Sequence, residues 1–495
     1  MHEVSPQCIA RESTDSFIVS FPGTTTTDVD SVDVPFQIEL PDYCQGSMLQ
    51  PTTALRNDRY NTTEMVYPTS VNIVAGVHST ACLIEPKYLP MSWAHHVNPE
   101  GANYYVNNAG AVCVVTDAPL HKQDIREKIH ASVEKIHILV EHLGFKLPAD
   151  CELYIKPCST SDKVSYYFVD HDSQTEFWLQ NVDSEELDIP DVSSIEHLKY
   201  ILQEHYWTHV EYFPHRSVST KHRDELVNML RHAQVDQLTS DSSTFPYDAE
   251  HCTKFLALIE GSDIDNPYMT CVIARLWIVI SQQRFTQFYA EDHARLCRFQ
   301  RRFELSPVVQ DIKAQICSAL LFGMPSSIQK DLEQLFVDRI VYGMHWRKFM
   351  LTQERSWRES AYLSAGLITA TAIALRFSRS LLCLTTGAVS LMLSLGALGS
   401  SIALLQRYVK GGEMNAATAA QHITEVEHDK YGFGPIAAIH SLPRALIYWT
   451  LVALAFHTLS YALTTQSITM IATTITMMIL AGTISFKSRS LLSNK

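Results

Sequence analysis

The chain has 495 residues and a net charge of −14, with 53 Asp and Glu against 39 Lys and Arg. This length allows two or three domains, and the acidic excess argues against nucleic acid as a partner, because phosphate binding needs clustered Lys and Arg. The eleven cysteines include no Cys-x-x-Cys pair, so we expect reduced thiols rather than a zinc site of paired cysteines.

Residues 1–88 mix Ser, Thr, Pro and Asp without a sustained apolar period. Such a stretch cannot bury enough apolar surface to offset its ordering entropy, so we expect a flexible N-terminal tail. Residues 1–20 also lack the basic and apolar regions of a secretory signal. The composition therefore predicts that the bulk of the chain stays in the cytosol.

Residues 89–119 contain short runs of strand-forming residues separated by turn residues. Trp93 begins the first run, Tyr105 stands in the second, and Pro119 ends the segment. The pattern predicts a small antiparallel β unit.

Residues 120–147 predict an amphipathic helix that links this unit to the next part of the chain. Its apolar residues recur every three or four positions, at Ile125, Ile129, Val133, Ile136, Val140 and Leu143. Gly144 follows as a helix stop signal, because glycine readily takes the left-handed conformation found after helix ends.

Residues 150–182 carry a second strand signal. The runs 167–170 and 175–178 are aromatic and β-branched and flank turn residues, which predicts a β-hairpin. Alternate side chains of a strand share one face, and Trp178 can lie beside Tyr167 across the two strands. Two such rings form a slot that suits a proline ring.

The hairpin resembles the second and third strands of a WW domain. This resemblance implies that Tyr167 and Trp178 form a proline groove. It also implies that Val169, His171 and Gln174 form the pocket for the tyrosine of a Pro-Pro-x-Tyr ligand.

The earlier β unit resembles the first two strands of a WW domain, in which Trp93, Tyr105 and Pro119 would close the small fold. Val115 stands where its groove tryptophan should be, and Lys156 stands where the second unit should have its first-strand tryptophan. The alternative for both units is a strand layer packed on helices, with the aromatic side chains in its core.

Residues 194–355 show helical periodicity throughout and predict a helical domain. The expected helices cover residues 194–210, 221–235, 248–260, 268–299, 307–322 and 325–350. Because no Gly-rich phosphate loop or nucleophile elbow occurs in this region, we predict no catalytic residues and no cofactor.

The first of these helices contains a candidate metal site. His205 and His209 stand four residues apart on one face, with Glu211 close by, and imidazoles at this spacing can share a Zn²⁺ ion. Tyr206 replaces the glutamate that follows the first histidine in metalloprotease helices. The alternative, which we prefer, is that these histidines stack and form hydrogen bonds at a helix end.

Residues 360–486 predict a transmembrane region, because a bilayer-spanning helix needs about 20 mostly apolar residues. The four expected spans are 360–376, 381–405, 445–464 and 466–486. Lys and Arg precede the first span, follow the last and lie in the central loop. By the positive-inside rule, both termini and the central loop are cytosolic, and an endomembrane location fits better than secretion.

Taken whole, residues 89–464 resemble a family of fungal WW-domain-containing membrane proteins, which implies an architecture and no chemistry. We expect a mainly α fold with small WW-like antiparallel β units, a helical bundle and a C-terminal α-helical transmembrane region. The expected function is a membrane-anchored, adaptor-like protein that presents aromatic surfaces to proline-containing segments. The alternatives are a metal-dependent enzyme or metal-binding protein centred on the helical domain, and a structural membrane protein with relic WW units.

Overall fold

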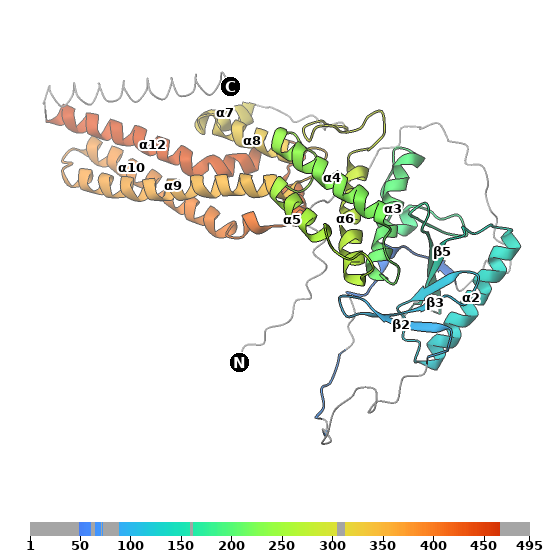
Figure 1. Cartoon of the computed structure of the whole chain (residues 1–495). Helices are drawn as coiled ribbons and strands as arrows, with labels where there is room; N and C mark the ends of the chain where they lie inside the picture. Colours follow the sequence, from blue (N-terminus) through green and yellow to red (C-terminus); the bar gives the residue numbers. More distant parts are fainter. Residues whose placement is uncertain are drawn as a thin grey trace. The chain divides into compact units, whose positions relative to one another are not determined.

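The computed structural model describes residues 49–60, 65–70, 72, 89–158, 162–303 and 312–465 (Figure 1). Their contacts form two compact units, Met1–Arg302 and Phe303–Lys495. The first unit holds a mixed β-sheet with helices, and the described part of the second is mainly helical. The prediction of a mainly α fold with a small β component is confirmed, whereas most of the predicted tail, residues 1–88, lies outside the described residues.

The described strands form one sheet in the order β1-β6-β5-β4-β3-β2, with β7 also paired to β6. The strands are β1 Leu49–Pro51, β2 Trp93–Val97, β3 Asn103–Asn107, β4 Cys113–Thr116, β5 Cys151–Pro157, β6 Val164–Asp170 and β7 Thr175–Phe177. Strands β6 and β7 pair antiparallel, with Phe168 opposite Phe177. The predicted β-hairpin is therefore confirmed.

Each of the two predicted β units, residues 89–119 and 150–182, forms a three-stranded antiparallel meander, β2-β3-β4 and β5-β6-β7. The meanders join through a parallel pair, β4 and β5, which places Cys113 opposite Glu152 and Val115 opposite Tyr154. A three-stranded unit is marginal alone, and the joined sheet is wide enough for helices to cover both faces. A parallel pair needs a long crossover connection, which the helix between the segments supplies.

Helix α2, Gln123–Leu143, covers one face of the sheet (Figure 1). Its buried residues include Ile129, Ile136 and Leu139, which lie on one stripe because their spacing matches the helical period. The helix ends at Gly144, whose φ of 59° is left-handed and whose N–H bonds the last turn. The predicted linking helix and its stop signal are confirmed.

Helix α3, Ile195–Tyr212, covers the opposite face of the sheet, and α6, Pro267–Thr286, packs on α3. The hydroxyl of Ser194 caps α3 by accepting the N–H of His197 at 2.9 Å. Every residue from Gln203 to Tyr212 is buried, because the helix is covered on two sides. Its polar side chains must therefore find partners inside the protein.

Helices α4, Thr220–Thr239, and α5, Ala249–Ile259, complete the described helices of the first unit. The predicted helix 268–299 is too long, because α6 ends at Thr286. Phe288 and Ala290 have φ angles of 52° and 68°, and left-handed residues of this kind cannot continue a right-handed helix.

The second unit begins with α7, Ile312–Leu320, α8, Met324–Leu335, and α9, Gly343–Arg376. The predicted helix 325–350 is wrong, because the chain leaves the helical conformation between α8 and α9. Asp338 and Arg339 have φ angles of 52° and 63° there. Helix α9 then runs without a break from the expected helical domain into the first expected span.

Helices α10, Leu381–Arg407, α11, Ala416–Val426, and α12, Gly434–Thr464, are the remaining described α-helices of the second unit. Small polar side chains are buried where α9, α10 and α12 pack together: Ser364, Thr371, Ser390, Ser394, Ser401 and Thr450. Large apolar side chains face outward from the same helices: Tyr362, Ile373, Met392, Leu395, Phe456 and Leu463. This distribution is the reverse of a water-soluble bundle, which buries its large apolar residues.

Two described helical segments are long and apolar enough to cross a membrane: Leu381–Glu413, which contains α10, and Gly434–Thr464, which is α12. They contain the second and third predicted spans. The first predicted span forms the end of α9, and the fourth, residues 466–486, lies outside the described residues.

Candidate functional site

Tyr167, the predicted groove tyrosine, lies in the core between the sheet and α3. Its side chain is 1% exposed, and its ring stacks on Tyr154 with the centroids 4.6 Å apart. Its hydroxyl lies 3.0 Å from Nδ1 of His209 on α3, and burial raises its pKa well above the usual range. In this fold Tyr167 therefore stabilises the contact between sheet and helix.

The other residues of the predicted groove and pocket also have partners within the first unit. The indole N–H of Trp178, which is half-buried, donates to the backbone oxygen of Thr52 at 2.7 Å. Val169 is buried, His171 lies 3.1 Å from a tyrosine hydroxyl of α3, and Gln174 contacts a histidine ring of α4. A peptide could reach Tyr167 and Val169 only if α3 moved away from the sheet.

The residues of the predicted metal site point to separate partners. Nδ1 of His205 lies 2.6 Å from Oε2 of Glu176 on β7, and Nε2 of His209 lies 2.8 Å from Oε1 of Glu152 on β5. Glu211 accepts a hydrogen bond from an arginine of α6. Two histidines one helical turn apart thus meet two different strands, and the three residues do not converge on one point.

Trp93, Tyr105 and Pro119 lie on or beside the α2 face of the sheet. Trp93 and Tyr105 both pack in the core between the sheet and α2, and the Tyr105 ring lies 5.3 Å from that of His95. The carbonyl of Pro119 accepts the N–H of Lys122 at the turn into α2. Trp93 is only half-buried, so part of its indole ring is accessible.

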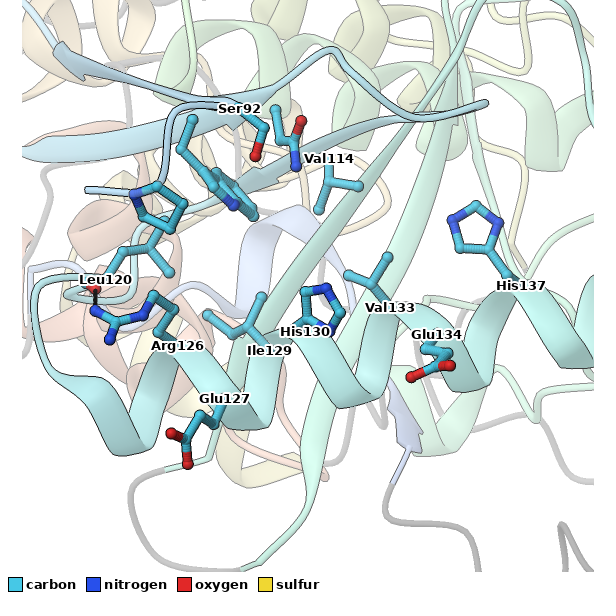
Figure 2. Close-up of a pocket in the computed structure, with 13 residues that line it drawn as sticks. Ser92, Val114, Leu120, Arg126, Glu127, Ile129, His130, Val133, Glu134 and His137 are labelled. Atoms are coloured by element: carbon cyan, nitrogen blue, oxygen red, sulfur yellow. Dashed lines mark hydrogen bonds between the residues drawn. The ribbon is translucent and has the colours of Figure 1, made fainter.

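This accessible part of Trp93 lines a cleft of about 700 Å³ between the sheet and α2 (Figure 2). The apolar lining comes from strands, from the turn before α2 and from α2 itself. Its members include Pro90, Trp93, Val114, Leu120, Ile129 and Val133. Figure 2 shows Ile129, His130 and Val133 of α2 directed toward the strands, with Val114 facing them.

The rim of the cleft is polar. Its charged and imidazole side chains come from α2: Arg126, Glu127, His130, Glu134 and His137. Arg126 donates to the carbonyl of Leu120 at 3.2 Å, whereas Glu127 and Glu134 are exposed. Two carboxylates against one guanidinium give the rim an acidic bias.

Strand β2 is an edge of the described sheet, because β3 is its only partner among the described residues. An edge strand presents unpaired N–H and C=O groups to an additional strand. Trp93 is the first residue of β2, so the edge and the cleft lie side by side. His95 and Val97 of the same strand are exposed.

No protein-family model, curated protein or solved structure matches the chain. The candidate site therefore rests on its own geometry. The sequence identified Trp93 and the apolar stripe of α2 as separate features. Their position on two sides of one cleft depends on the crossover from β4 to β5, for which no local pattern exists.

Proposed function

We propose that the protein is a membrane-anchored interaction protein that binds an extended, proline-containing segment of a partner in the cleft between β2 and α2. The observation that carries this proposal is the edge strand β2 beside a cleft lined by Trp93. An extended segment can add a strand to β2 through backbone hydrogen bonds while one of its side chains enters the cleft. A proline ring packs well on the flat indole and has little conformational entropy left to lose.

The acidic rim favours a segment whose proline is flanked by basic residues. Glu127 and Glu134 are exposed, and Arg126 is already bonded to a carbonyl group. Complementary charges at a rim mainly increase the rate of association and select among partners. The net charge of −14 acts in the same direction.

In this proposal the membrane anchor consists of the C-terminal half of α9 together with α10 and α12. Lipid can solvate the apolar side chains on the outside of these helices, and small residues inside allow close packing. Their hydroxyl groups bond the helix backbone, as Ser394 does to Leu391 and Thr450 does to Leu446. The expected fourth span, 466–486, would bring the C-terminus to the cytosolic side with the N-terminus.

The peptide-binding proposal is tested with the full chain in detergent and a fluorescent Pro-Pro-x-Tyr peptide flanked by lysines, followed by fluorescence anisotropy. Trp93→Ala should weaken binding at least about tenfold, or about 1.4 kcal/mol, because it removes the largest ring of the cleft. The double charge reversal of Glu127→Lys with Glu134→Lys should weaken binding most at low salt. Met91→Ala serves as the control, because Met91 is exposed nearby but does not line the cleft.

Saturable binding that survives Trp93→Ala would place the peptide elsewhere. If that binding were lost in Trp178→Phe, the second meander would be its site and α3 would have to move. Absence of binding up to about 1 mM, a standard free energy of about −4 kcal/mol, would refute the interaction role for this class of peptide.

The topology is tested separately in sealed microsomes. A tag at Met1 should be digested by added protease, because the proposed orientation places the N-terminus in the cytosol. Protection of the tag would reverse the orientation.

A further inference from the structure

A second cluster of functional groups, independent of the cleft, surrounds the carboxylate of Glu152 on the α3 face of the sheet. Glu152 on β5 is buried and stands opposite Cys113 on β4. Helix α3 supplies His209, the segment after α3 supplies His215, and the turn after β6 supplies His171. Side chains from distant parts of the chain thus converge on one carboxylate.

The two oxygens of Glu152 have different surroundings. Oε1 lies 2.8 Å from Nε2 of His209, which is an ordinary hydrogen bond to a carboxylate and holds its orientation. Oε2 lies 3.1 Å from Nε2 of His215, 3.4 Å from Nε2 of His171 and 3.7 Å from Sγ of Cys113. One oxygen is therefore held by a single donor, and the other faces three groups at longer range.

Two of the three longer distances, those from Oε2 to His171 and Cys113, match the edges of a tetrahedron around a metal ion, and the distance to His215 is slightly shorter. Bonds from Zn²⁺ to nitrogen and oxygen are about 2.0–2.2 Å and to sulfur about 2.3 Å, so tetrahedral ligand atoms lie about 3.3–3.7 Å apart. Strong hydrogen bonds to a carboxylate are shorter, about 2.7–2.9 Å. The ligand atoms of Cys113, Glu152 and His215 all lie within 4.8 Å of one another.

We propose that Cys113, Glu152 and His215 bind a divalent transition-metal ion. His171 lies beside Glu152 and would have to turn toward the ion to become a fourth ligand. A thiolate, a carboxylate and imidazoles together suit Zn²⁺, which accepts sulfur, nitrogen and oxygen ligands. Nδ1 of His171 lies 3.1 Å from the hydroxyl of Tyr206. An outer hydrogen bond of this kind is typical of metal-binding histidines, because it directs the Nε2 lone pair to the metal.

Binding of a metal ion by Cys113 requires that the thiol lose its proton to solvent, as for any thiolate ligand. Nδ1 of His215 is buried and has no hydrogen-bond partner in the described part of the chain. The ring can therefore turn toward the ion without breaking a bond at that nitrogen.

A cavity of about 390 Å³ leads to the cluster from the first unit's surface. It is lined by His171, His209 and His215, by residues between α3 and α4 such as Arg216, and by Lys221 at the start of α4. This cavity gives an ion a path to the ligands, which a buried site requires. It also places His171 on the open side of the proposed site.

The test uses the full chain in detergent, stripped by a chelator and titrated with Co²⁺, whose bond to a thiolate gives an intense near-ultraviolet absorption band. We expect one Co²⁺ ion per chain and displacement of the band by Zn²⁺. Cys113→Ser should abolish the band. Cys151→Ser should retain it, because Cys151 is buried on the α2 face of the same strand pair.

His215→Gln is the second variant, because His215 lies outside the strands and helices and its replacement leaves the sheet intact. It should weaken Co²⁺ binding at least about tenfold with an unchanged circular dichroism spectrum. If Cys113→Ser fails to fold, the result for His215→Gln decides. The proposal is overturned if the stripped chain binds no Co²⁺, or if these variants bind it as the native chain does.

Discussion

The burial of Tyr167 leads to a prediction that separates a core residue from a peptide groove. Tyr167→Phe keeps the ring that stacks on Tyr154 but removes the hydroxyl that meets Nδ1 of His209. Leaving a buried polar group without its partner costs about 1–3 kcal/mol. Tyr167→Ala also removes the ring, and large-to-small changes of aromatic core residues cost about 3–5 kcal/mol.

The full free-energy costs given by these ranges apply to Tyr167, because its side chain is 1% exposed. The ring stack with Tyr154 adds about 0.5–1.5 kcal/mol to the loss in the alanine variant. A tyrosine that faced solvent in a groove would change the free energy of unfolding by less than about 0.5 kcal/mol. The two interpretations therefore differ by several kcal/mol.

The assay is pulse proteolysis of the full chain in detergent across a series of urea concentrations, with the fragments of the first unit followed by gel. Tyr67→Ala is the matched control, since Tyr67 is 83% exposed and should tolerate the change. Suppose instead that Tyr167→Ala unfolded at the same urea concentration as the native chain and lost only peptide binding. Tyr167 would then face a ligand, and the packing of α3 over this face of the sheet would be refuted.

Three further predictions concern other contacts. Gly387→Val should destabilise the second unit in thermal unfolding by about 1–3 kcal/mol, because a Cβ at position 387 would lie 2.5 Å from a leucine side chain of α9. Gly399→Val should be neutral, because a Cβ at position 399 would have no neighbouring atom of the described residues within 4 Å. Equal losses of stability would contradict the packing of α9, α10 and α12. Arg275→Ala should lower the free energy of unfolding of the first unit by about 1–3 kcal/mol, because Arg275 pairs with a buried carboxylate of α3; this range is already reduced because the guanidinium is half-exposed. Arg231→Ala removes an exposed ion pair and should cost less than about 0.5 kcal/mol. Similar urea midpoints for the two variants would refute the difference. Burial raises the pKa of Glu176 above its usual 4.5, so the folded state binds the carboxyl proton more tightly than the unfolded state. The free energy of unfolding should therefore fall as the pH rises from 4.5 through the folded pKa. A stability difference between Glu176→Gln and the native chain that stays constant over this pH range would contradict the prediction.

Much of the local structure follows from short-range patterns. The hairpin of β6 and β7 was predicted from two aromatic runs around turn residues, and α2 from an apolar stripe that ends at Gly144. Helix α3 begins one residue from the predicted start, at the cap formed by Ser194. The helix 325–350 was wrong because left-handed conformations at Asp338 and Arg339 have no clear signal in their residue types.

The candidate sites were harder to predict, because their residues are far apart in the sequence. Tyr167 and Val169 were expected on one face and do share it. The sequence could not show that α3 covers this face. Cys113 and Glu152 are 39 residues apart, and they meet only because β4 and β5 pair in parallel. The candidate metal site within α3, to which hydrogen-bonded histidines were preferred, was based on one helix, whereas the carboxylates that its histidines meet come from strands.

The sequence by itself determined the mainly helical class, the hairpin of β6 and β7, helix α2, and the apolar segments within α9, α10 and α12. Each depends on residues a few positions apart, whose spacing alone decides which side chains share a face. Only the tertiary structure decided that the meanders form one sheet, that α3 covers the predicted groove, and that an edge strand and α2 frame a cleft. These features depend on which surfaces pack together, and packing is set by the burial of whole faces rather than by any local pattern.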